Sequence, residues 1–288
     1  MWVGIGVRIG QNRFATSVGV LDLFPNASVA YSLRLLRSAY TGSAIRVRRS
    51  SDNTEQNIGF NSLGDLDTTA LDTFCSGTNG FVTTWYDQSG NGNNLTQTTA
   101  ANQPQIVSSG SVILQNTKPT IQTDGNDFIE TTALNIYASA NNLSSFQVVT
   151  DLTNTTANDF VFGVTSGSYG GGDNNIILRK NSTQFDAIVN NGIISATATH
   201  TRDTNQNLLS FIYRGGIDLT FWKNSATNVN STVASSVNAT KELEVASALN
   251  ATLAGSWYLQ EKIDWKTDQT ANASDIRTNM ANYWGITL

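Results

Sequence analysis

The feature that most constrains the fold is a succession of short β-prone runs separated by glycine- and asparagine-containing turns. From residue 80 onward, runs rich in Val, Ile, Phe, Tyr and Thr alternate with such turns over most of the chain. The clearest turn signal is Asn191-Gly192, which lies between apolar runs at 185–189 and 193–194 and predicts a β-hairpin. Because no repeat of 20 to 50 residues is evident, the pattern favours an antiparallel two-sheet sandwich or jelly roll over a solenoid or propeller.

A few helical segments interrupt this pattern. We predict a helix over 27–40, a short helix over 67–74 capped by Asp67 or Thr68, and a closing helix over 270–284 that ends at Gly285. Strands are predicted over 44–49 and 80–86, among others. The predicted fold class is therefore all-β, a β-sandwich with a few short helices and a C-terminal closing helix.

Composition narrows the function classes. Apolar residues make up 39% of the 288 residues, enough for a core, whereas the net charge of −5 argues against general binding to nucleic-acid phosphates. The single cysteine, Cys75, excludes an intrachain disulfide, and the single histidine, His200, leaves no histidine cluster for a metal. We expect no metal and no cofactor. No segment has the roughly 20 consecutive apolar residues of a membrane-spanning helix, so we expect no membrane insertion.

The first residues form a separate pattern. Val3, Ile5, Val7 and Ile9 alternate with Gly and Arg, which is the period of a strand. We therefore predict two parts, an N-terminal assembly arm over 1–22 and a sandwich domain over 23–288. A strand needs partners for its backbone groups, so the arm is expected to pair with a neighbouring protein; the alternative is addition to an edge of its own sandwich.

The most distinctive motif is the run from Thr83 to Gln97. Asp and Ser side chains can accept hydrogen bonds from turn amides, Gly permits positive φ, and Asn tolerates the left-handed region. The run predicts a structural turn, and the alternative is a loop that offers Asp87 to a cation or a sugar. The residues of the predicted turn are Asp87, Ser89, Gly90, Asn91, Gly92 and Asn93.

This run resembles the turn of concanavalin-like (laminin-G-like) jelly-roll domains, and especially that of the catalytic domain of α-L-arabinofuranosidase B. In that family Asp-Thr-Phe-Cys, a strand, and Tyr-Asp-Gln-Ser-Gly-Asn-Gly-Asn occur in the same order as here at 72–75 and 86–93. Segments 31–37 and 45–52 are also similar to the family's helix and first strand. The resemblance covers roughly residues 24–130 and the last 30 residues, and it implies a concanavalin-like jelly roll.

The resemblance does not carry the family's catalytic carboxylates with it. Retaining glycosidases use two carboxylates about 5 Å apart. The family's nucleophile segment is similar to 179–181, where this chain has Arg179, Lys180 and Asn181 in place of acids, and the stretch similar to its acid/base turn, 246–255, has no carboxylate. The family's adjacent cysteine pair has no counterpart. These absences predict that the chain is not an enzyme and has no catalytic residue.

Domains with the same segments at 30–34 and 45–53, preceded by a short glycine-rich arm, resemble virion proteins of bacteriophages. This resemblance implies a non-enzymatic protein located in the virion, associated with capsid or tail. It would present a lectin-like jelly roll that binds a host-surface glycan. Its partners would be other virion proteins, held through residues 1–22, and further copies of itself in a homo-oligomer.

Two other functions stay open, a glycoside hydrolase similar to the arabinofuranosidases and a purely structural capsid or spike component. Two carboxylates that face one another would support the hydrolase. The candidate carboxylates are Glu130, Asp173, Asp186, Glu261 and Asp264. An aromatic platform in a groove would favour glycan binding over a purely structural role, because sugar faces stack on rings. The candidate ligand-binding residues are Tyr169, Asp173 and Trp222.

Overall fold

The computed structural model describes residues 18–153, 158–165, 174–247 and 254–288. The helices are α1 (Val20–Leu23), α2 (Thr68–Phe74) and α3 (Ala273–Trp284), with a 3-10 turn η1 (Ala100–Asn102). The strands are β1 (Val29–Ser32), β2 (Ile45–Arg49), β3 (Glu55–Ile58), β4 (Gly80–Trp85), β5 (Leu95–Thr96), β6 (Gln105–Ser108), β7 (Ser111–Val112), β8 (Leu114–Gln115), β9 (Lys118–Pro119), β10 (Ile121–Gln122), β11 (Ile129–Thr131), β12 (Asn142–Asp151), β13 (Asp159–Thr165), β14 (Asn174–Lys180), β15 (Gln184–Asn191), β16 (Ser195–Thr201), β17 (Gln206–Arg214), β18 (Asp218–Lys223), β19 (Ala226–Asn230), β20 (Glu244–Val245) and β21 (Trp257–Trp265).

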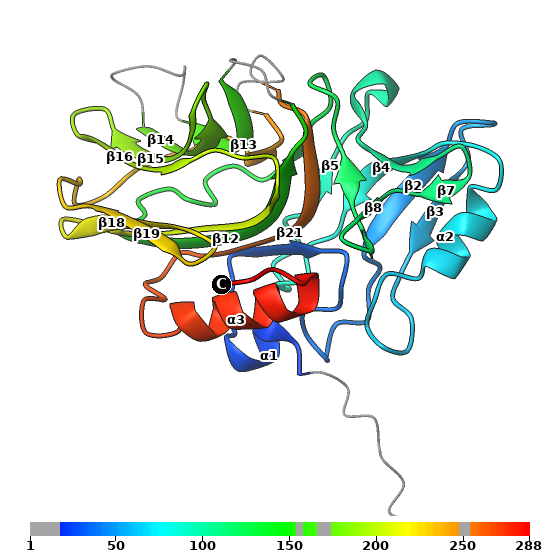
Figure 1. The fold of residues 1–288 in the computed structure, drawn as a ribbon, viewed down its shortest axis with the longest axis horizontal. Coiled ribbons are helices and arrows are strands. Elements are labelled where there is room, and N and C mark those ends of the chain that lie inside the picture. The colour runs from blue at the N-terminus through cyan, green and yellow to red at the C-terminus, as the bar shows by residue number, and fades with distance from the viewer. Residues whose placement is uncertain (1–17, 154–157, 166–173, 248–253) are drawn as a thin grey trace, which may run out of the picture.

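Two runs of antiparallel strands build the sandwich. The first has the order β19–β18–β17–β12–β21, and the far edge of β21 pairs with β1 and β10. The second has the order β16–β15–β14–β13–β20–β11–β5–β4. Because β4 also pairs with β6, and β6 with β10, the two runs are continuous with each other. Figure 1 shows the two layers at the β12–β19 end and the smaller β2–β8 region beside them. The predicted all-β class is confirmed.

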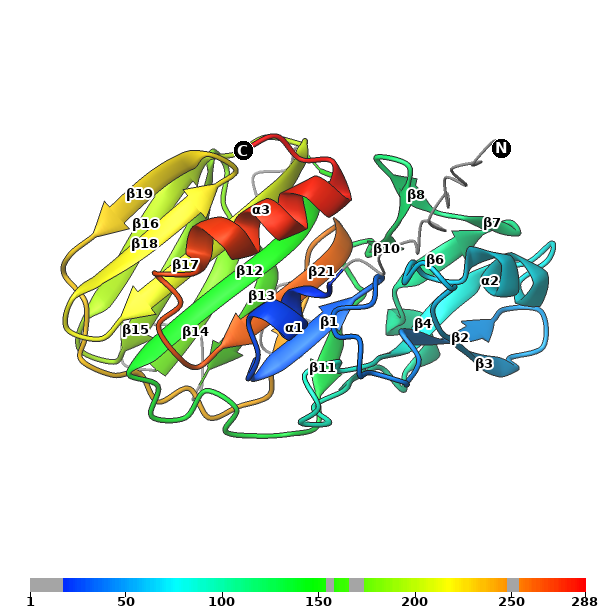
Figure 2. The same ribbon diagram turned by 90° about the horizontal axis from the view of Figure 1, so that it is seen from below.

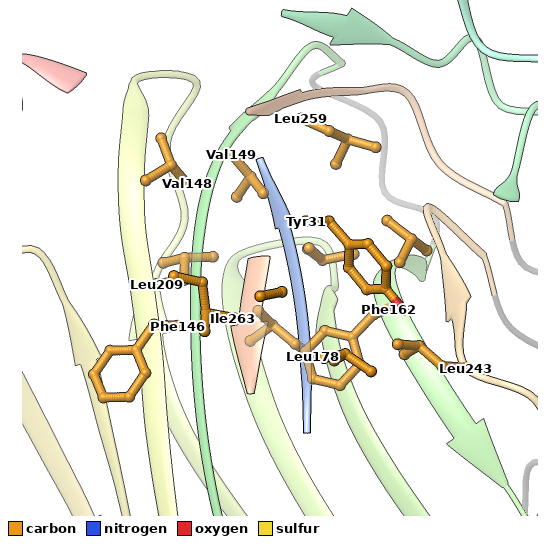
Figure 3. Close-up of a cluster of buried hydrophobic side chains, with 14 of the residues drawn as sticks. Tyr31, Phe146, Val148, Val149, Phe162, Leu178, Leu209, Leu243, Leu259 and Ile263 are labelled. Carbon is orange, nitrogen blue, oxygen red and sulfur yellow. The ribbon is translucent and has the colours of Figure 1, made fainter. Parts of the chain in front are cut away.

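The core lies on both sides of the first run of strands. Between the two layers Phe162 stacks on Phe211, with ring centroids 6.0 Å apart. On the opposite side of β12, beneath α3, Phe146 packs edge-to-face on Trp265. Figure 3 shows Tyr31, Phe146, Phe162 and Ile263 with aliphatic neighbours in one contiguous cluster. Burial of such large side chains is the main driving force for folding a chain with so few charges.

The closing helix α3 covers the outer side of β12 and β17, as Figure 2 shows. Its buried face is formed by Ile276, Met280 and Trp284, at the spacing predicted from the sequence. Gly285 ends the helix with φ of 71°, a left-handed conformation that residues with a side chain rarely adopt. In the described part of the chain, no helix combines the length and apolar character needed to cross a membrane.

Several other elements predicted from local signals are confirmed. The α2 helix begins after Asp67, whose side chain accepts a hydrogen bond from the amide of Ala70. The Asn191-Gly192 segment joins β15 to β16 as a hairpin, with Gly192 at φ of 84°. Strands β2 and β4 match the predicted strands over 44–49 and 80–86.

The helix predicted over 27–40 is wrong, because this segment contains β1 and an extended stretch. The Gln88 side chain accepts from the amide of Leu36 and donates to the carbonyls of Ser32 and Arg34. Strand β1 pairs along its whole length with β21. These long-range hydrogen bonds satisfy the backbone in an extended form and override the helical spacing of the apolar residues.

The turn motif holds β1 to the body. Asp87 is 4% exposed, and its carboxylate accepts from the amides of Ala30, Ser89 and Asn93 and from the Ser89 hydroxyl, at 2.8–3.0 Å. Asn91 donates from its side chain to the carbonyl of Ala27. The motif is thus a rigid turn that also ties an edge strand in place.

Most of the predicted N-terminal arm, residues 1–17, lies outside the described residues. Its last part does not stand apart, because α1 begins at Val20, and Val20 and Leu21 are buried in the core. The amide of Leu21 donates to the carbonyl of Leu36. Residues 20–22 therefore belong to the folded body.

Candidate active site

The second run of strands has one face toward the core and one face away from it. Alternate residues of β14 and β15, such as Leu178 and Ala187, belong to the core cluster. The residues between them point to the opposite face, which we call the outer face. Cross-strand register places further residues on it, since partners in a ladder share a side. The outer face carries Asn175, Ile177, Arg179, Asp186, Ile188, Gly163, Glu244 and Glu130.

Two glutamates are direct neighbours on this outer face. Glu130 of β11 and Glu244 of β20 are cross-strand partners, and such partners have Cβ atoms about 5 Å apart. Glu244 is 7% exposed and Glu130 is partly buried. The Glu130 carboxylate has no hydrogen-bond or ion-pair partner in the described part of the chain. Two acidic groups are therefore held close together with little access to bulk water.

Burial and like charge change the acidity of Glu130. Its pKa is raised to about 6, first by burial and then by the negative charges of Glu244 and Glu242. Glu130 thus keeps its proton at mildly acidic pH, where an ordinary glutamate would have lost it. A protonated carboxyl next to a second carboxylate is the combination that general acid catalysis with nucleophilic attack requires.

A third acid of the outer face, Asp186, lies beside segment 179–181, which contains no acidic residue. Asp186 of β15 is 2% exposed, and its Oδ2 accepts from Nε of Arg179 at 3.1 Å and from Nδ2 of Asn181 at 2.8 Å. Its Oδ1 is buried and has no hydrogen-bond partner among the described residues. The neighbouring strand therefore supplies a carboxylate to the segment 179–181, which sequence comparison along one strand could not reveal.

Lys180, between these two residues, points to the core side. Its Nζ forms ion pairs with Asp151 at 2.6 Å and with Asp159 at 2.9 Å, and all three residues are buried. Arg202 completes the network through Asp151. Its buried ion pairs give Lys180 a structural role rather than a position toward a ligand on the outer face.

Two of the candidate acids predicted from sequence are structural. Glu261 accepts from both Nε and Nη2 of Arg34, from Ser32 and from the indole of Trp284. Asp264 accepts from Lys262, Ser145 and Tyr137 in the core. Glu261 is held beneath α3 and Asp264 between the two layers, so neither carboxylate lies on the outer face.

Of the predicted ligand-binding residues, Tyr169 and Asp173 lie outside the described residues. Trp222 of β18 packs partly into the core, and the guanidinium of Arg277 lies over its ring at 5.3 Å. One face of this ring is thereby covered, and Trp222 is not on the outer face that carries the glutamates.

The single histidine and cysteine do not form a reactive pair. A ring nitrogen of His200 bonds to the carbonyl of Phe221, and burial lowers the pKa of His200. Cys75 is buried, and burial raises the pKa of its thiol to about 11, so it stays protonated. Within the described ranges, no three His, Cys, Asp or Glu side chains are grouped closely enough to hold a metal ion.

The family model and the curated relatives that match this chain point to the same protein family. The family model of the catalytic domain of α-L-arabinofuranosidase B matches residues 25–175, more than half of the chain. Among curated proteins, a probable α-L-arabinofuranosidase B of Aspergillus terreus is 45% identical over 74 residues, which are 25% of this chain and 15% of that protein. The corresponding protein of Aspergillus flavus is 42% identical over 99 residues, which are 32% of this chain and 20% of that protein.

Solved structures show the same fold at low sequence identity. A GH54 α-L-arabinofuranosidase soaked with a cyclic sulfate inhibitor has a TM-score of 0.66 at 17% identity, covering 88% of this chain and 62% of that one. An arabinofuranosidase complexed with arabinofuranosyl-α-1,2-xylobiose has a TM-score of 0.61 at 16% identity, with the same coverage. The chain spans about a fifth or less of the length of these curated relatives and under two thirds of these solved chains.

These comparisons overturn the expected function. The expectation of a non-enzymatic bacteriophage virion protein, located in the virion and presenting a lectin-like domain to a host-surface glycan, is wrong, because the family model, curated relatives and solved structures are those of glycoside hydrolases. The expectation that the chain is not an enzyme rested on 179–181 and 246–255, whereas the carboxylates of the outer face come from other strands. This chain belongs to the family of α-L-arabinofuranosidase B catalytic domains.

Proposed function

We propose that the chain is a glycoside hydrolase that cleaves α-L-arabinofuranosyl linkages, with Glu130 and Glu244 as its catalytic carboxylates. The observation that carries this proposal is their direct cross-strand pairing on the outer face. Cross-strand partners have Cβ atoms about 5 Å apart. This pairing allows the two carboxyl groups to reach the separation of about 5 Å that hydrolases retaining anomeric configuration use. We also propose that the sandwich is of the concanavalin-like jelly-roll class, which the resemblance of the Asp87 turn supports.

Each glutamate has a role that its surroundings support. Glu130 holds its proton up to a pH of about 6 and donates it to the glycosidic oxygen as the bond to the anomeric carbon breaks. The carboxylate of Glu244 forms the new bond to that carbon. Glu130, now ionised, then takes a proton from water, and the resulting hydroxide displaces Glu244 and releases the sugar.

The choice of an arabinofuranosyl substrate rests on the family and on the ligands of the solved relatives. One of them was soaked with 4-nitrophenyl α-L-arabinofuranoside, and another holds arabinofuranosyl-α-1,2-xylobiose. These names describe the neighbours, and the same substrate class is proposed for this chain.

A second assignment of the nucleophile has its own observation. Asp186 presents a buried Oδ1 without a partner, while Arg179 and Asn181 hold its Oδ2. This is the arrangement of a carboxylate whose second oxygen is reserved for a ligand. The same reaction with Asp186 in place of Glu244 is therefore the alternative that the experiment must separate.

Release of 4-nitrophenol from 4-nitrophenyl α-L-arabinofuranoside tests the proposal. We expect activity in the full chain at about pH 5, and its loss by a factor of about 100 or more in E244Q. Glu55→Gln, an exposed substitution on β3, is the matched control and should keep the rate of the native chain. Loss of activity in D186N with normal activity in E244Q would transfer the nucleophile to Asp186. Absence of release by the folded native chain would refute the hydrolase.

A further inference from the structure

We propose that a cavity beside β4, β6 and β10 is a binding subsite for a neutral oligosaccharide, the part of the substrate that carries the arabinofuranosyl unit. The choice of a sugar as its ligand rests on the proposed hydrolase function. The cavity has a volume of about 290 Å³, near the small end of the range for ligand pockets, which suits one or two sugar units. It is lined by Phe81, Ala100, Ala101, Gln103, Gln105, Gln122, Asp124 and Asp127. We call it the Gln122 cavity.

The floor of the Gln122 cavity is one row of a sheet. Phe81 of β4 pairs with Gln105 of β6, and Gln105 pairs with Gln122 of β10, so the three side chains stand on one side. Their neighbours Val82 and Ile106 belong to the core on the other side. Figure 2 shows β4, β6 and β10 side by side. The row is therefore held rigidly by backbone pairing, which lowers the entropy lost when a ligand binds.

Amide groups in this row are not used by the fold. The Gln122 side chain makes no hydrogen bond to any described residue, and Gln105 donates from Nε2 to the carbonyl of Val107 but leaves Oε1 unpaired within the described chain. Gln103, by contrast, is fixed by Nε of Arg48 and by the carbonyl of Gln97, and forms a wall. Free amide donors and acceptors beside fixed ones can bind sugar hydroxyls, each of which both donates and accepts.

Two aspartates close the opposite side. Asp127 is 7% exposed, and its pKa is raised to about 7 by burial and by the nearby charge of Asp124. Asp124 is exposed, and its Oδ1 accepts from the amide of Asn126. The raised pKa favours the protonated form of Asp127 at mildly acidic pH, and a carboxyl group can both donate to and accept from sugar hydroxyls.

The remaining wall, formed by Ala100 and Ala101, is apolar, and Phe81 adds an aromatic ring at one end of the floor. The ring of Phe81 lines the cavity and is braced by the Arg48 guanidinium 5.0 Å from its centroid. A ring beside a few polar groups is the general composition of sites for small organic ligands, and the C–H face of a sugar packs on such a ring. Asp127 lies three residues before Glu130 in the sequence, so the segment that forms the cavity leads directly into β11 of the proposed catalytic pair. The subsite would hold the remainder of the substrate while its arabinofuranosyl unit reacts.

Calorimetric titration with arabinofuranosyl-α-1,2-xylobiose at about pH 5 tests the subsite in the full chain carrying E244Q, which stops turnover. We expect Q122A and D127N each to weaken binding about fivefold, the effect of one hydrogen bond, and F81A about tenfold. Gln56→Ala, an exposed glutamine of β3, is the matched control and should leave the affinity unchanged. Circular dichroism identifies the variants that are folded.

A second readout separates the subsite from the hydrolase. With Glu244 present, Gln56→Ala should keep the native KM for both substrates. Q122A should raise the KM for the oligosaccharide by a clearly larger factor than the KM for 4-nitrophenyl α-L-arabinofuranoside, because the nitrophenyl substrate has no further sugar to bind. Native affinity for the oligosaccharide in Q122A and D127N would overturn the subsite, as would an absence of binding to the folded chain. If the native chain releases no nitrophenol but Q122A still loses oligosaccharide affinity, the subsite stands and only the hydrolase fails.

Discussion

Asp87 and Glu130 are both buried or partly buried acids of the same sandwich, but the fold treats them in opposite ways. Asp87 accepts four hydrogen bonds from three residues, Ala30 of β1 and Ser89 and Asn93 of its own turn. Glu130 faces another glutamate and has no hydrogen-bond partner within the described residues, and its pKa rises to about 6. A carboxylate whose oxygens are all used by its own chain is structural, whereas one placed beside a like charge costs stability and is available for chemistry.

Of the substitutions considered, replacing the structural acid Asp87 should have the largest effect on the free energy of unfolding. Asp87→Ala leaves the buried amide of Ala30 and the partly buried amide of Asn93 without an acceptor, so we expect a loss of about 3–5 kcal/mol in the free energy of unfolding. Urea denaturation followed by tryptophan fluorescence measures it. Asp52→Ala, which removes an exposed ion pair with Arg49, should cost far less, because water screens that pair. Equal losses in the two variants would show that the Asp87 turn does not fasten β1.

Replacing Glu130, the acid proposed to take part in catalysis, should change the reaction rate rather than the stability of the fold. In E130Q the glycosidic oxygen no longer receives a proton, so kcat for an oligosaccharide should fall about 10²- to 10⁴-fold. The fall should be smaller for 4-nitrophenyl α-L-arabinofuranoside, because nitrophenolate leaves without a proton. Comparison of kcat for the two substrates in the native chain and in E130Q measures the difference. The assignment of Glu130 as the acid fails if both substrates lose activity equally.

Asp127 provides a pH-dependent contrast to Asp87. Its pKa in the folded chain, about 7, lies above the value of an unfolded aspartate, so the folded state binds the proton more tightly. Its contribution to stability is therefore full below about pH 4 and is lost as the pH rises to about 7. We expect the difference in unfolding free energy between D127N and the native chain to shift in favour of D127N over this interval. A constant difference, measured in urea at several pH values, would contradict the raised pKa.

The smallest expected effect comes from E242Q, which tests why the pKa of Glu130 is raised. Glu242 contributes to the raised pKa of Glu130 through its negative charge. In E242Q the ionised form of Glu130 is less disfavoured, so its pKa should fall by a fraction of a unit. The limb of kcat/KM that declines above about pH 6 should move to lower pH by the same amount. If the decline of kcat/KM stays at the same pH or moves to higher pH in E242Q, the titrating group is not Glu130.

The parts of the fold that sequence could predict are those governed by local chemistry. Asp67 caps α2 three residues before its hydrogen-bond partner, and Asn191-Gly192 encodes its own hairpin. The prediction of a helix over 27–40 was wrong because the conformation of this segment is set by hydrogen bonds to Gln88, more than fifty residues away. Local spacing cannot report such a partner.

The candidate site depends on long-range pairing even more strongly. Glu130 was among the predicted acids, but Glu244 was not, and only the pairing of β11 with β20 brings them together. Asp186 was also a candidate, yet its contact with Asn181 across the β14–β15 hairpin was not predicted. Arg179 and Lys180 therefore suggested an inactive segment, since residues along one strand say little about what the next strand supplies.

The most direct measurement of the central claim compares activity and stability in one variant, E244Q. Removing the charge that faces Glu130 should lower the rate of nitrophenol release about 100-fold or more, while the urea-unfolding transition of E244Q stays cooperative, as expected of a folded chain. That result would show that the fold places the two glutamates together for chemistry. A folded E244Q chain that releases nitrophenol at the native rate would contradict it.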